Sequence, residues 1–381
     1  MKKIAVVLAA TISACPIVAH ADIKVGVTIS ASGPAASLGI PERNAIALAP
    51  KEMNGEPVSY IVLDDASDPT IARRNIERLV TQDGVDIVIG SSTSPASLAM
   101  VEVAGQTKTP MISLGASRAI IFPMNENKKW AFKTPFNDAT QAGATVKDML
   151  ARGYKTVATF AFNDAYGEGW VQEFKPLAEA AGLKFVAEEK FNPKDTSVTA
   201  QALKVVAARP DAVLIVASGT PGALPQIALT QRGYQGQVYQ TTGVVNGEFL
   251  KIGGKAVEGL LIAGNPISVA SELPQEHPAQ AEAAKFAKAY NERHGGGSVS
   301  AFAGYAQDAL LLLEGALPKA MESARPGTPE FRAALRDAIE KSDGVQTTSG
   351  PVTMSPEDHN GYTSDAPIMI RVKNGAFSIA Q

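Results

Sequence analysis

The sequence predicts an α/β fold in which two doubly wound parallel sheets form two successive lobes. Three observations support this prediction. Short apolar segments alternate with longer segments of helical periodicity along most of the chain. The alternation breaks at Thr134-Pro135 and then restarts in a second block of similar size. The chain has 381 residues, of which 45% are hydrophobic, so it can form two or three globular domains.

The first block reads as a series of βαβ units. Asp68-Pro69 fits a helix N-cap followed by proline in the first turn, which fixes the start of one helix. A short strand at 130–133 is expected to end the block. The other predicted strands are 23–29, 58–63, 86–89 and 110–113, and the predicted helices are 38–53, 70–82 and 95–106.

The second block repeats the pattern, and a helical segment follows it. The predicted strands are 156–161, 184–190, 211–217, 237–240 and 259–263, and the predicted helices are 139–151, 166–181, 197–208 and 221–231. Residues 280–341 read as three helices, 280–293, 301–322 and 328–341. A third, purely helical domain is one interpretation. We favour a return to the first lobe, because the apolar face of 301–317 needs a sheet to cover. Asn374-Gly375 near the end predicts a hairpin.

The first 21 residues, 1–21, have the pattern of an export signal. Lys2-Lys3 precede an apolar stretch, and Ala19-His20-Ala21 fits the small-x-small rule for cleavage. A second interpretation is a lipoprotein signal acylated at Cys15. Cleavage after Ala21 is favoured, because the first strand begins almost immediately afterwards. Cys15 is the only cysteine, so the mature chain would have no disulfide.

Charge and composition exclude several classes of partner. The formal net charge is −3 and no basic tract is present, so neither nucleic acid nor an anionic membrane is expected as a partner. No later segment is both apolar and long enough to span a bilayer.

The sequence offers little that could support catalysis. His277, His294 and His359 lie among Pro, Gly and Asn residues and are predicted to be solvated loop residues, and there is no Gly-x-Ser-x-Gly motif. Gly167-Glu168-Gly169 is only a fragment of a dinucleotide fingerprint. The acids at 64–68 are interpreted as a strand end and a helix cap, not as a metal site. We therefore expect no enzyme, no metal and no cofactor.

Polar loops follow the predicted strands in both blocks. In the first block they are 30–34, 91–94 and 113–117; in the second they are 162–167, 218–221 and 241–246. Because the carboxyl ends of parallel strands share one edge of a sheet, each set should converge. Loop 91–94 also opens a helix, whose free N–H groups attract anions. The arrangement predicts a site for a small carboxylate.

Several of these segments carry a family resemblance. They are 23–27, the Ser-Gly-Pro-Ala loop at 32–35, Asp64-Asp65 before Asp68-Pro69, 110–113, 164–167, and the helix 301–313 with Phe302, Tyr305 and Asp308. In order and spacing the chain resembles the type I periplasmic solute-binding proteins of ABC importers, the group that includes the leucine/isoleucine/valine-binding proteins. The resemblance covers essentially the whole mature chain.

The resemblance implies two lobes joined by three crossover segments, near 134–138, 264–268 and 343–347. Lobe one would comprise 22–135 plus 268–344, and lobe two 136–267 plus 345–381. The lobes would close on a solute in the periplasm, and the closed form would dock on an inner-membrane permease. We expect a monomer. A sensory module that presents its ligand to a membrane receptor is the alternative function.

The resemblance also assigns roles to residues. Ser92, Thr93, Gly115 and Ser117 would hold the ligand carboxylate, and Tyr166 would close over it from lobe two. The candidate ligand-binding residues are Ser92, Thr93, Ser94, Gly115, Ala116, Ser117, Tyr166, Ser218 and Gly243.

One departure from the family bears on the ligand. Amino-acid binders place a carboxylate for the ligand ammonium in the loop after the strand near 237–240. Here that loop has no acid before Glu248, and a buried unpaired ammonium is costly. We therefore predict an aromatic carboxylate of the benzoate type. A branched-chain or other hydrophobic amino acid is the alternative, in which Asp65 or Asp164 would supply the charge.

Overall fold

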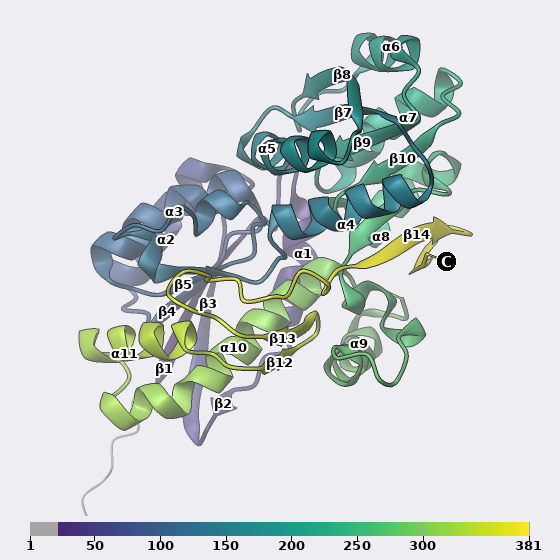
Figure 1. The fold of residues 1–381 in the computed structure, drawn as a ribbon. Helices are drawn as coiled ribbons and strands as arrows, with labels where there is room; N and C mark the ends of the chain where they lie inside the picture. The colour runs from purple at the N-terminus through teal and green to yellow at the C-terminus, as the bar shows by residue number, and fades with distance from the viewer. Residues whose placement is uncertain (1–21, 298, 381) are drawn as a thin grey trace, which may run out of the picture.

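The computed structural model describes residues 22–297 and 299–380. The predicted export signal, with Cys15 and the cleavage site after Ala21, lies outside the described residues. The chain forms two α/β lobes side by side, which confirms the predicted fold class (Figure 1).

The first lobe contains a six-stranded sheet with the order β2-β3-β1-β4-β5-β6. Strand β1 lies at its centre and pairs in parallel with β3 and β4. The strands are β1 (Ile23–Ile29), β2 (Glu52–Met53), β3 (Glu56–Asp64), β4 (Ile87–Gly90), β5 (Met111–Ser113) and β6 (Ala131–Lys133), and the helices are α1 (Ala36–Ile46), α2 (Pro69–Thr81) and α3 (Ser94–Thr107).

The second lobe contains a seven-stranded sheet with the order β15-β14-β11-β10-β9-β7-β8. The strands are β7 (Thr156–Phe162), β8 (Lys184–Phe191), β9 (Ala212–Val216), β10 (Gln237–Gln240), β11 (Leu261–Gly264), β14 (Ile368–Lys373) and β15 (Ala376–Ile379), and the helices are α4 (Asp138–Ala151), α5 (Ala165–Ala180), α6 (Thr199–Ala208), α7 (Ala223–Gln231) and α8 (Gly247–Gly253). Strands β14 and β15 pair antiparallel through the Asn-Gly turn, where Asn374 and Gly375 have φ of 54° and 73°, so the predicted hairpin is confirmed.

Both sheets reverse their strand order beside the first strand of the lobe. The reversal lies between β1 and β4 in the first sheet and between β7 and β9 in the second. Ligands of open parallel sheets bind outside the carboxyl ends of the strands at such a point. The topology therefore marks the loops that follow these four strands.

Three later helices follow the second lobe: α9 (Gln280–His294), α10 (Ala301–Ser323) and α11 (Pro329–Glu340). Helix α10 packs on α1 and α11, and its apolar face joins the core formed by β1 and β4 (Figure 1). The predicted return of these helices to the first lobe is confirmed. In the described part of the chain, no helix is long and apolar enough to span a membrane.

A small hairpin, β12 (Val345–Thr347) with β13 (Gly350–Val352), lies against α10 (Figure 1). Asp308 of α10 is fully buried and accepts hydrogen bonds from Thr348 N at 2.7 Å and Ser349 Oγ at 2.8 Å. The chain then enters the second sheet at β14. The predicted lobe boundary after residue 344 stays a prediction, and these contacts favour a later crossing, between β13 and β14.

We expect replacement of Asp308 by Asn to change how stability depends on pH. Burial raises the pKa of Asp308 to about 6, although several donors oppose the shift. In the unfolded chain this pKa is about 4, so the folded state binds the extra proton between these values. The stability that the neutral carboxyl contributes is therefore lost as the pH rises from about 4 to about 6. Over this range the free energy of unfolding of wild type should fall by roughly 3 kcal/mol relative to that of D308N. Urea unfolding of both proteins across this range measures the difference; a constant difference would contradict the prediction.

Predictions about one helix and about two histidines are wrong. The helix predicted over 38–53 ends at Ile46, and β2 pairs antiparallel with β3 soon after, because Pro50 cannot continue the helix. His294 is not a solvated loop residue but the half-buried last residue of α9, in contact with the ring of Tyr290. His359 is not solvated: it is fully buried, stacks on Phe132 and contacts Glu340 at 3.1 Å. The tertiary fold buries this loop between β6 and α11, which its local sequence does not show.

Candidate ligand-binding site between the lobes

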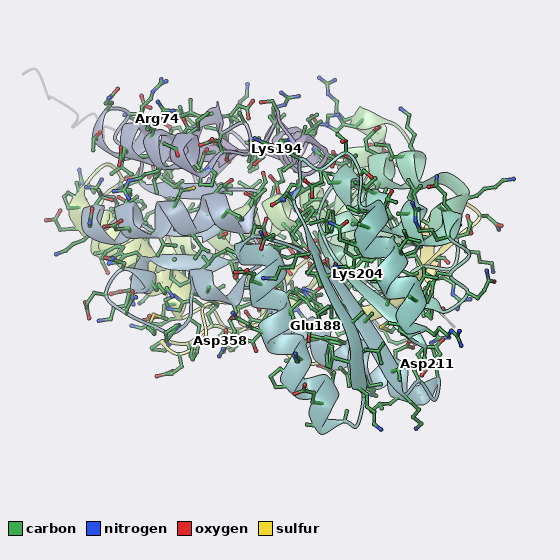
Figure 2. All side chains as sticks on the ribbon, turned by 90° about the horizontal axis from the view of Figure 1, so that it is seen from above. Arg74, Glu188, Lys194, Lys204, Asp211 and Asp358 are labelled. Atoms are coloured by element: carbon green, nitrogen blue, oxygen red, sulfur yellow. The ribbon has the colours of Figure 1, made fainter. Side chains whose placement is uncertain are left out.

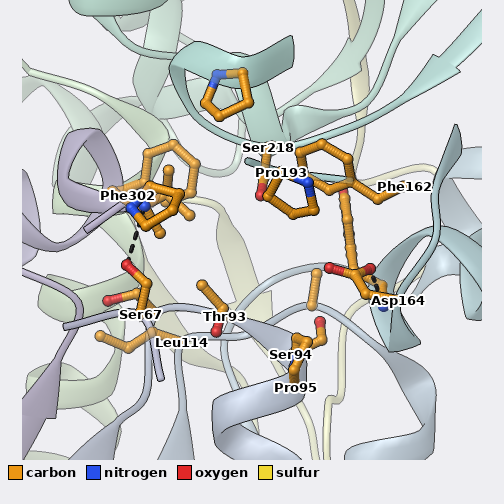
Figure 3. A pocket seen from close by; sticks show the side chains of 18 of the residues that line it. Ser67, Thr93, Ser94, Pro95, Leu114, Phe162, Asp164, Pro193, Ser218 and Phe302 are labelled. Carbon is orange, nitrogen blue, oxygen red and sulfur yellow. Dashed lines mark hydrogen bonds between the residues drawn. The ribbon is translucent and has the colours of Figure 1, made fainter. Parts of the chain in front are cut away.

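A cavity of about 440 Å³ lies between the lobes, at the strand ends marked by the topology (Figure 3). In Figure 3, Thr93 and Ser94 of the first lobe face Ser218 and Phe162 of the second across the cavity. The lining residues come from both lobes and from α10: Pro34, Ala35, Leu38, Ser67, Ser92, Thr93, Ser94, Pro95, Leu114, Ala116, Phe162, Asp164, Tyr166, Asn192, Pro193, Lys194, Ser218, Pro221, Thr242, Gly243, Phe302 and Tyr305.

The N-terminus of α3 forms the first-lobe side of the cavity. Thr93 is the N-cap, and its hydroxyl accepts from Ala96 N at 3.4 Å. The Ser94 hydroxyl accepts from Ser117 N at 3.0 Å and so ties the two predicted loops together. Gly90 allows the turn into this loop, because its φ is +122° and a Cβ there would lie 1.8 Å from Thr28 O. The positive end of the helix dipole therefore points at the cavity.

Two predicted residues, Gly115 and Ser117, are not among those that line the cavity. Gly115 N donates to Ser113 Oγ at 3.0 Å. Ser117 is 1% exposed, and its hydroxyl accepts from Ala119 N at 3.3 Å at the start of a 3₁₀ turn. Their contacts hold the loop between β5 and β6 in shape. A direct role for them in ligand binding stays a prediction.

Tyr166 and Gly243 form part of the second-lobe wall. Tyr166 donates to Thr241 Oγ1 at 2.6 Å, and burial raises the pKa of its phenol, so it remains a neutral hydroxyl. Gly243 lies directly beside it: a Cβ on Gly243 would be 3.0 Å from the Tyr166 hydroxyl and 2.4 Å from Ala217 O. The close approach of loop 241–246 to Tyr166 therefore requires glycine at this position.

Two charged side chains line the cavity, and both belong to the second lobe. Asp164 caps α5 by accepting from Tyr166 N at 2.9 Å and Gly167 N at 3.0 Å, and burial raises the pKa of its carboxyl. Lys194, in the loop after β8, is exposed, and Figure 2 shows it where the two lobes meet. Asp65 is fully buried behind the first-lobe loops and does not line the cavity. Of the two acids considered for an ammonium, only Asp164 faces the ligand space.

Apolar side chains make up much of the remaining wall, among them Leu38, Leu114, Phe162 and Phe302. Phe302 and Tyr305 come from α10, and the site prediction did not include them. Their spacing in an apolar helix is that of core residues, so their periodicity alone gives no sign of a ligand. Asn192 to Lys194 were also missed, although they follow a predicted strand end, as the other site loops do.

The lobes touch each other around the cavity. Arg118 of the first lobe and Glu173 of α5 form an ion pair at 3.3 Å. A Cβ on Gly219 in the second lobe would lie 3.0 Å from Leu38 of α1. The structure therefore has the two lobes closed over the site.

Comparison with known proteins bears on this two-lobed arrangement. The family model described as a periplasmic binding protein matches residues 22–376. The chain belongs to the periplasmic binding protein family. This agrees with the resemblance stated above, and the family is one of solute-binding proteins.

This periplasmic binding protein is similar in sequence or in structure to three known proteins. It is 25% identical to the Leu/Ile/Val-binding protein BraC3 of Rhizobium johnstonii, over 93% of this chain and 92% of the other. It is 43% identical to an extracellular ligand-binding receptor from Rhodopseudomonas palustris HaA2, with a TM-score of 0.91 over 94% of this chain and all of that one. A solute-binding protein from R. palustris in complex with benzoate shares the fold, with 23% identity and a TM-score of 0.80 over 94% of this chain and 95% of the other.

Within the described residues of this periplasmic binding protein, no group of three or more His, Cys, Asp or Glu side chains is placed to hold a metal ion. The acids at 64–68 have structural partners instead. Asp68 caps α2 through Thr70 N and Ile71 N, and Asp64 accepts from Ala66 N at 2.8 Å.

Proposed function

We propose that this protein captures a small carboxylate with an apolar body in the periplasm and delivers it to an inner-membrane ABC permease. One observation carries the proposal: a largely apolar cavity between the lobes has the N-terminus of α3 at one side. A helix N-terminus with hydroxyls favours a carboxylate, and apolar walls favour a hydrocarbon body. The permease is inferred from the family, and export from the pattern of residues 1–21.

Among such carboxylates, the aromatic class is favoured over amino acids. Loop 241–246 contributes Thr242 and Gly243 to the wall and no acid. Phe162 and Phe302 add aromatic rings to the wall, and Lys194 adds a positive charge where the two lobes meet. The fold itself does not separate the two classes, since its members include a Leu/Ile/Val-binding protein and a benzoate complex.

A calorimetric titration of the mature protein tests the function. The panel contains benzoate, cinnamate, 4-methylpentanoate, leucine and valine. We expect benzoate or cinnamate to bind, and a ligand at about 100 times its Kd to stabilise the protein by about 2.7 kcal/mol in thermal unfolding. Binding of leucine or valine with no response to either aromatic acid would overturn the aromatic preference. No binding by any carboxylate would overturn the proposed function.

Replacing Asp164 by Asn tests how the site treats an ammonium group. Asn can still cap α5, so we expect the fold to be preserved. A carboxylate without an amino group gains or keeps affinity, because a like charge has been removed from the cavity. An amino-acid ligand would instead lose roughly 10- to 100-fold, since its ammonium would lose its counter-charge. Titration of wild type and D164N with benzoate and leucine separates these results; a large loss for benzoate would contradict the proposed orientation.

A further inference from the structure

A buried acid lies directly behind the cavity wall. Glu42 of α1 is 0% exposed, and its Oε2 is hydrogen-bonded to the hydroxyl of Ser92. Ser92 is itself one of the residues that line the cavity. Ser92 therefore links the carboxyl of Glu42 to the wall of the cavity.

The surroundings of Glu42 favour its neutral form. Its Oε1 has no hydrogen-bond partner among the described residues, and no described cation forms an ion pair with it. Asp65 adds a nearby negative charge, and burial raises the pKa of Glu42 well above its ordinary value. An ionised carboxylate that is buried with one partner and no cation is strongly disfavoured.

Asp65 is the other acid of this cluster, and its partners differ. It accepts from Ser30 Oγ at 2.7 Å, Ser91 Oγ at 2.6 Å and Ser67 N at 3.0 Å. Burial raises its pKa as well, but these three donors favour the ionised form. Of the two acids, Glu42 therefore has the surroundings that favour the protonated form more strongly.

The other groups facing Glu42 bring no positive charge. The phenol of Tyr305 in α10 is close enough to interact electrostatically with Glu42. Tyr290 of α9 donates to Pro41 O in the same turn of α1. Strand β1 and the loop after it contribute Ser30, whose backbone N–H donates to Ser92 Oγ at 2.8 Å. The titratable groups around Glu42 are thus Asp65 and two neutral phenols.

The protonation of Glu42 decides what the Ser92 hydroxyl can do. A serine hydroxyl has one proton to donate and two lone pairs to accept with. One lone pair is taken by Ser30 N. If Glu42 is ionised, Ser92 must donate its proton to Glu42 and has none left for a ligand. If Glu42 is protonated, Glu42 donates to the second lone pair, and the Ser92 proton is free to point into the cavity.

We propose that Glu42 is a positioning residue that holds the Ser92 hydroxyl as a donor for the ligand carboxylate, so that tight binding requires the proton on Glu42. The inference rests on the proposed function, a carboxylate bound in this cavity. The two equilibria are then linked: anion binding favours the protonated form of Glu42, and protonation of Glu42 favours anion binding to the same extent.

The test is a titration of the mature protein with benzoate and with 4-methylpentanoate, from about pH 6 to about pH 9.5, where both probes stay ionised. For wild type, the affinity is expected to be constant at low pH and then to fall, approaching about tenfold per pH unit once free Glu42 ionises. Titrations in two buffers of different ionisation enthalpy should show proton uptake that rises towards one proton per ligand over the same range.

Three variants locate the effect. In E42Q the amide always donates to Ser92, so the pH dependence and the proton uptake should disappear. In S92A the affinity should be weaker and also independent of pH. The control is D86N, which removes a buried acid elsewhere in the first lobe, where it accepts from Lys24 N and Gly327 N; it should keep the wild-type profile.

Wild-type affinity that is flat across the range, or an E42Q profile that still follows the wild type, would overturn the inference and leave the proposed function standing. Proton uptake by wild type that persists in E42Q would do the same. If no carboxylate of the panel binds wild type at about pH 6, the proposed function fails, and this inference fails with it.

Discussion

Replacing Gly243 by Val is expected to abolish ligand binding almost completely. A Cβ at this position would lie 2.4 Å from Ala217 O, 2.9 Å from Ser218 Cβ and 3.0 Å from the Tyr166 hydroxyl. Ser218 and Tyr166 both line the cavity, so a side chain here forces apart the second-lobe wall. We expect affinity for the carboxylate that binds wild type to fall by about 100-fold or more, equivalent to about 3 kcal/mol.

The matched control is Gly247→Ala, a few residues along the same loop at the start of α8. A Cβ there meets no atom within 4 Å, so affinity and stability should stay close to those of wild type. Titration calorimetry gives the affinities, and thermal unfolding shows whether each variant is folded. Wild-type affinity in G243V would mean that the ligand does not depend on this wall.

Replacing Lys133 by Met is expected to cause the largest loss of stability. Lys133 ends β6 and is fully buried; its Nζ donates to Pro135 O at 2.7 Å and to Phe136 O at 3.1 Å. Burial lowers its pKa and raises that of the neighbouring buried Asp138. Methionine fills a similar volume but removes both of these hydrogen bonds from a buried cation, and it takes away one of the two cations that act on Asp138, the other being Arg118. We expect the free energy of unfolding to fall by roughly 3 kcal/mol or more.

Three further variants show whether the loss comes from the buried cation: D138N, K133M/D138N and K24M. Adding Asp138→Asn to K133M should cost less than D138N costs in wild type, because the charge that it removes has already lost its partner. Lys24→Met, which changes an exposed lysine of β1, should alter stability by no more than about 0.5 kcal/mol. Urea unfolding is measured for wild type and for the four variants K133M, D138N, K133M/D138N and K24M. Additive losses from K133M and D138N would show that the two residues act independently.

Features encoded within a short window of sequence were predictable. Strands such as 23–29 and 156–161 are apolar segments set between helices, and the Asp68-Pro69 cap and the Asn374-Gly375 turn are local signals that the structure confirms. The strand-end rule also predicted that the loops containing Thr93, Ser94, Tyr166 and Ser218 converge, and all four residues line one cavity.

Features that depend on which distant segments meet were not predictable in this way. Glu42 has the sequence context of an ordinary helix acid and is buried by distant segments that pack on α1, among them α10 and the loop of Ser92. Phe302 and Tyr305 lie in an apolar stripe of α10 that also contributes to the hydrophobic core. Nothing in the local sequence therefore distinguishes residues of the cavity wall from residues of the core. Whether the predicted site residues bind the ligand stays a prediction that the variants above can test.

The order of elements along the chain has a consequence for biosynthesis. The sheet of the first lobe ends with β6 at Lys133, but α10 and α11, whose apolar residues share a core with β1 and β4, begin only at Ala301. A chain emerging from the ribosome or a translocation channel therefore cannot finish its first lobe until nearly all of the second has been made. The part of the apolar face around β1 that α1 does not cover lacks its partner helices for that time. We infer that folding of the first lobe is completed only after most of the second has been synthesised.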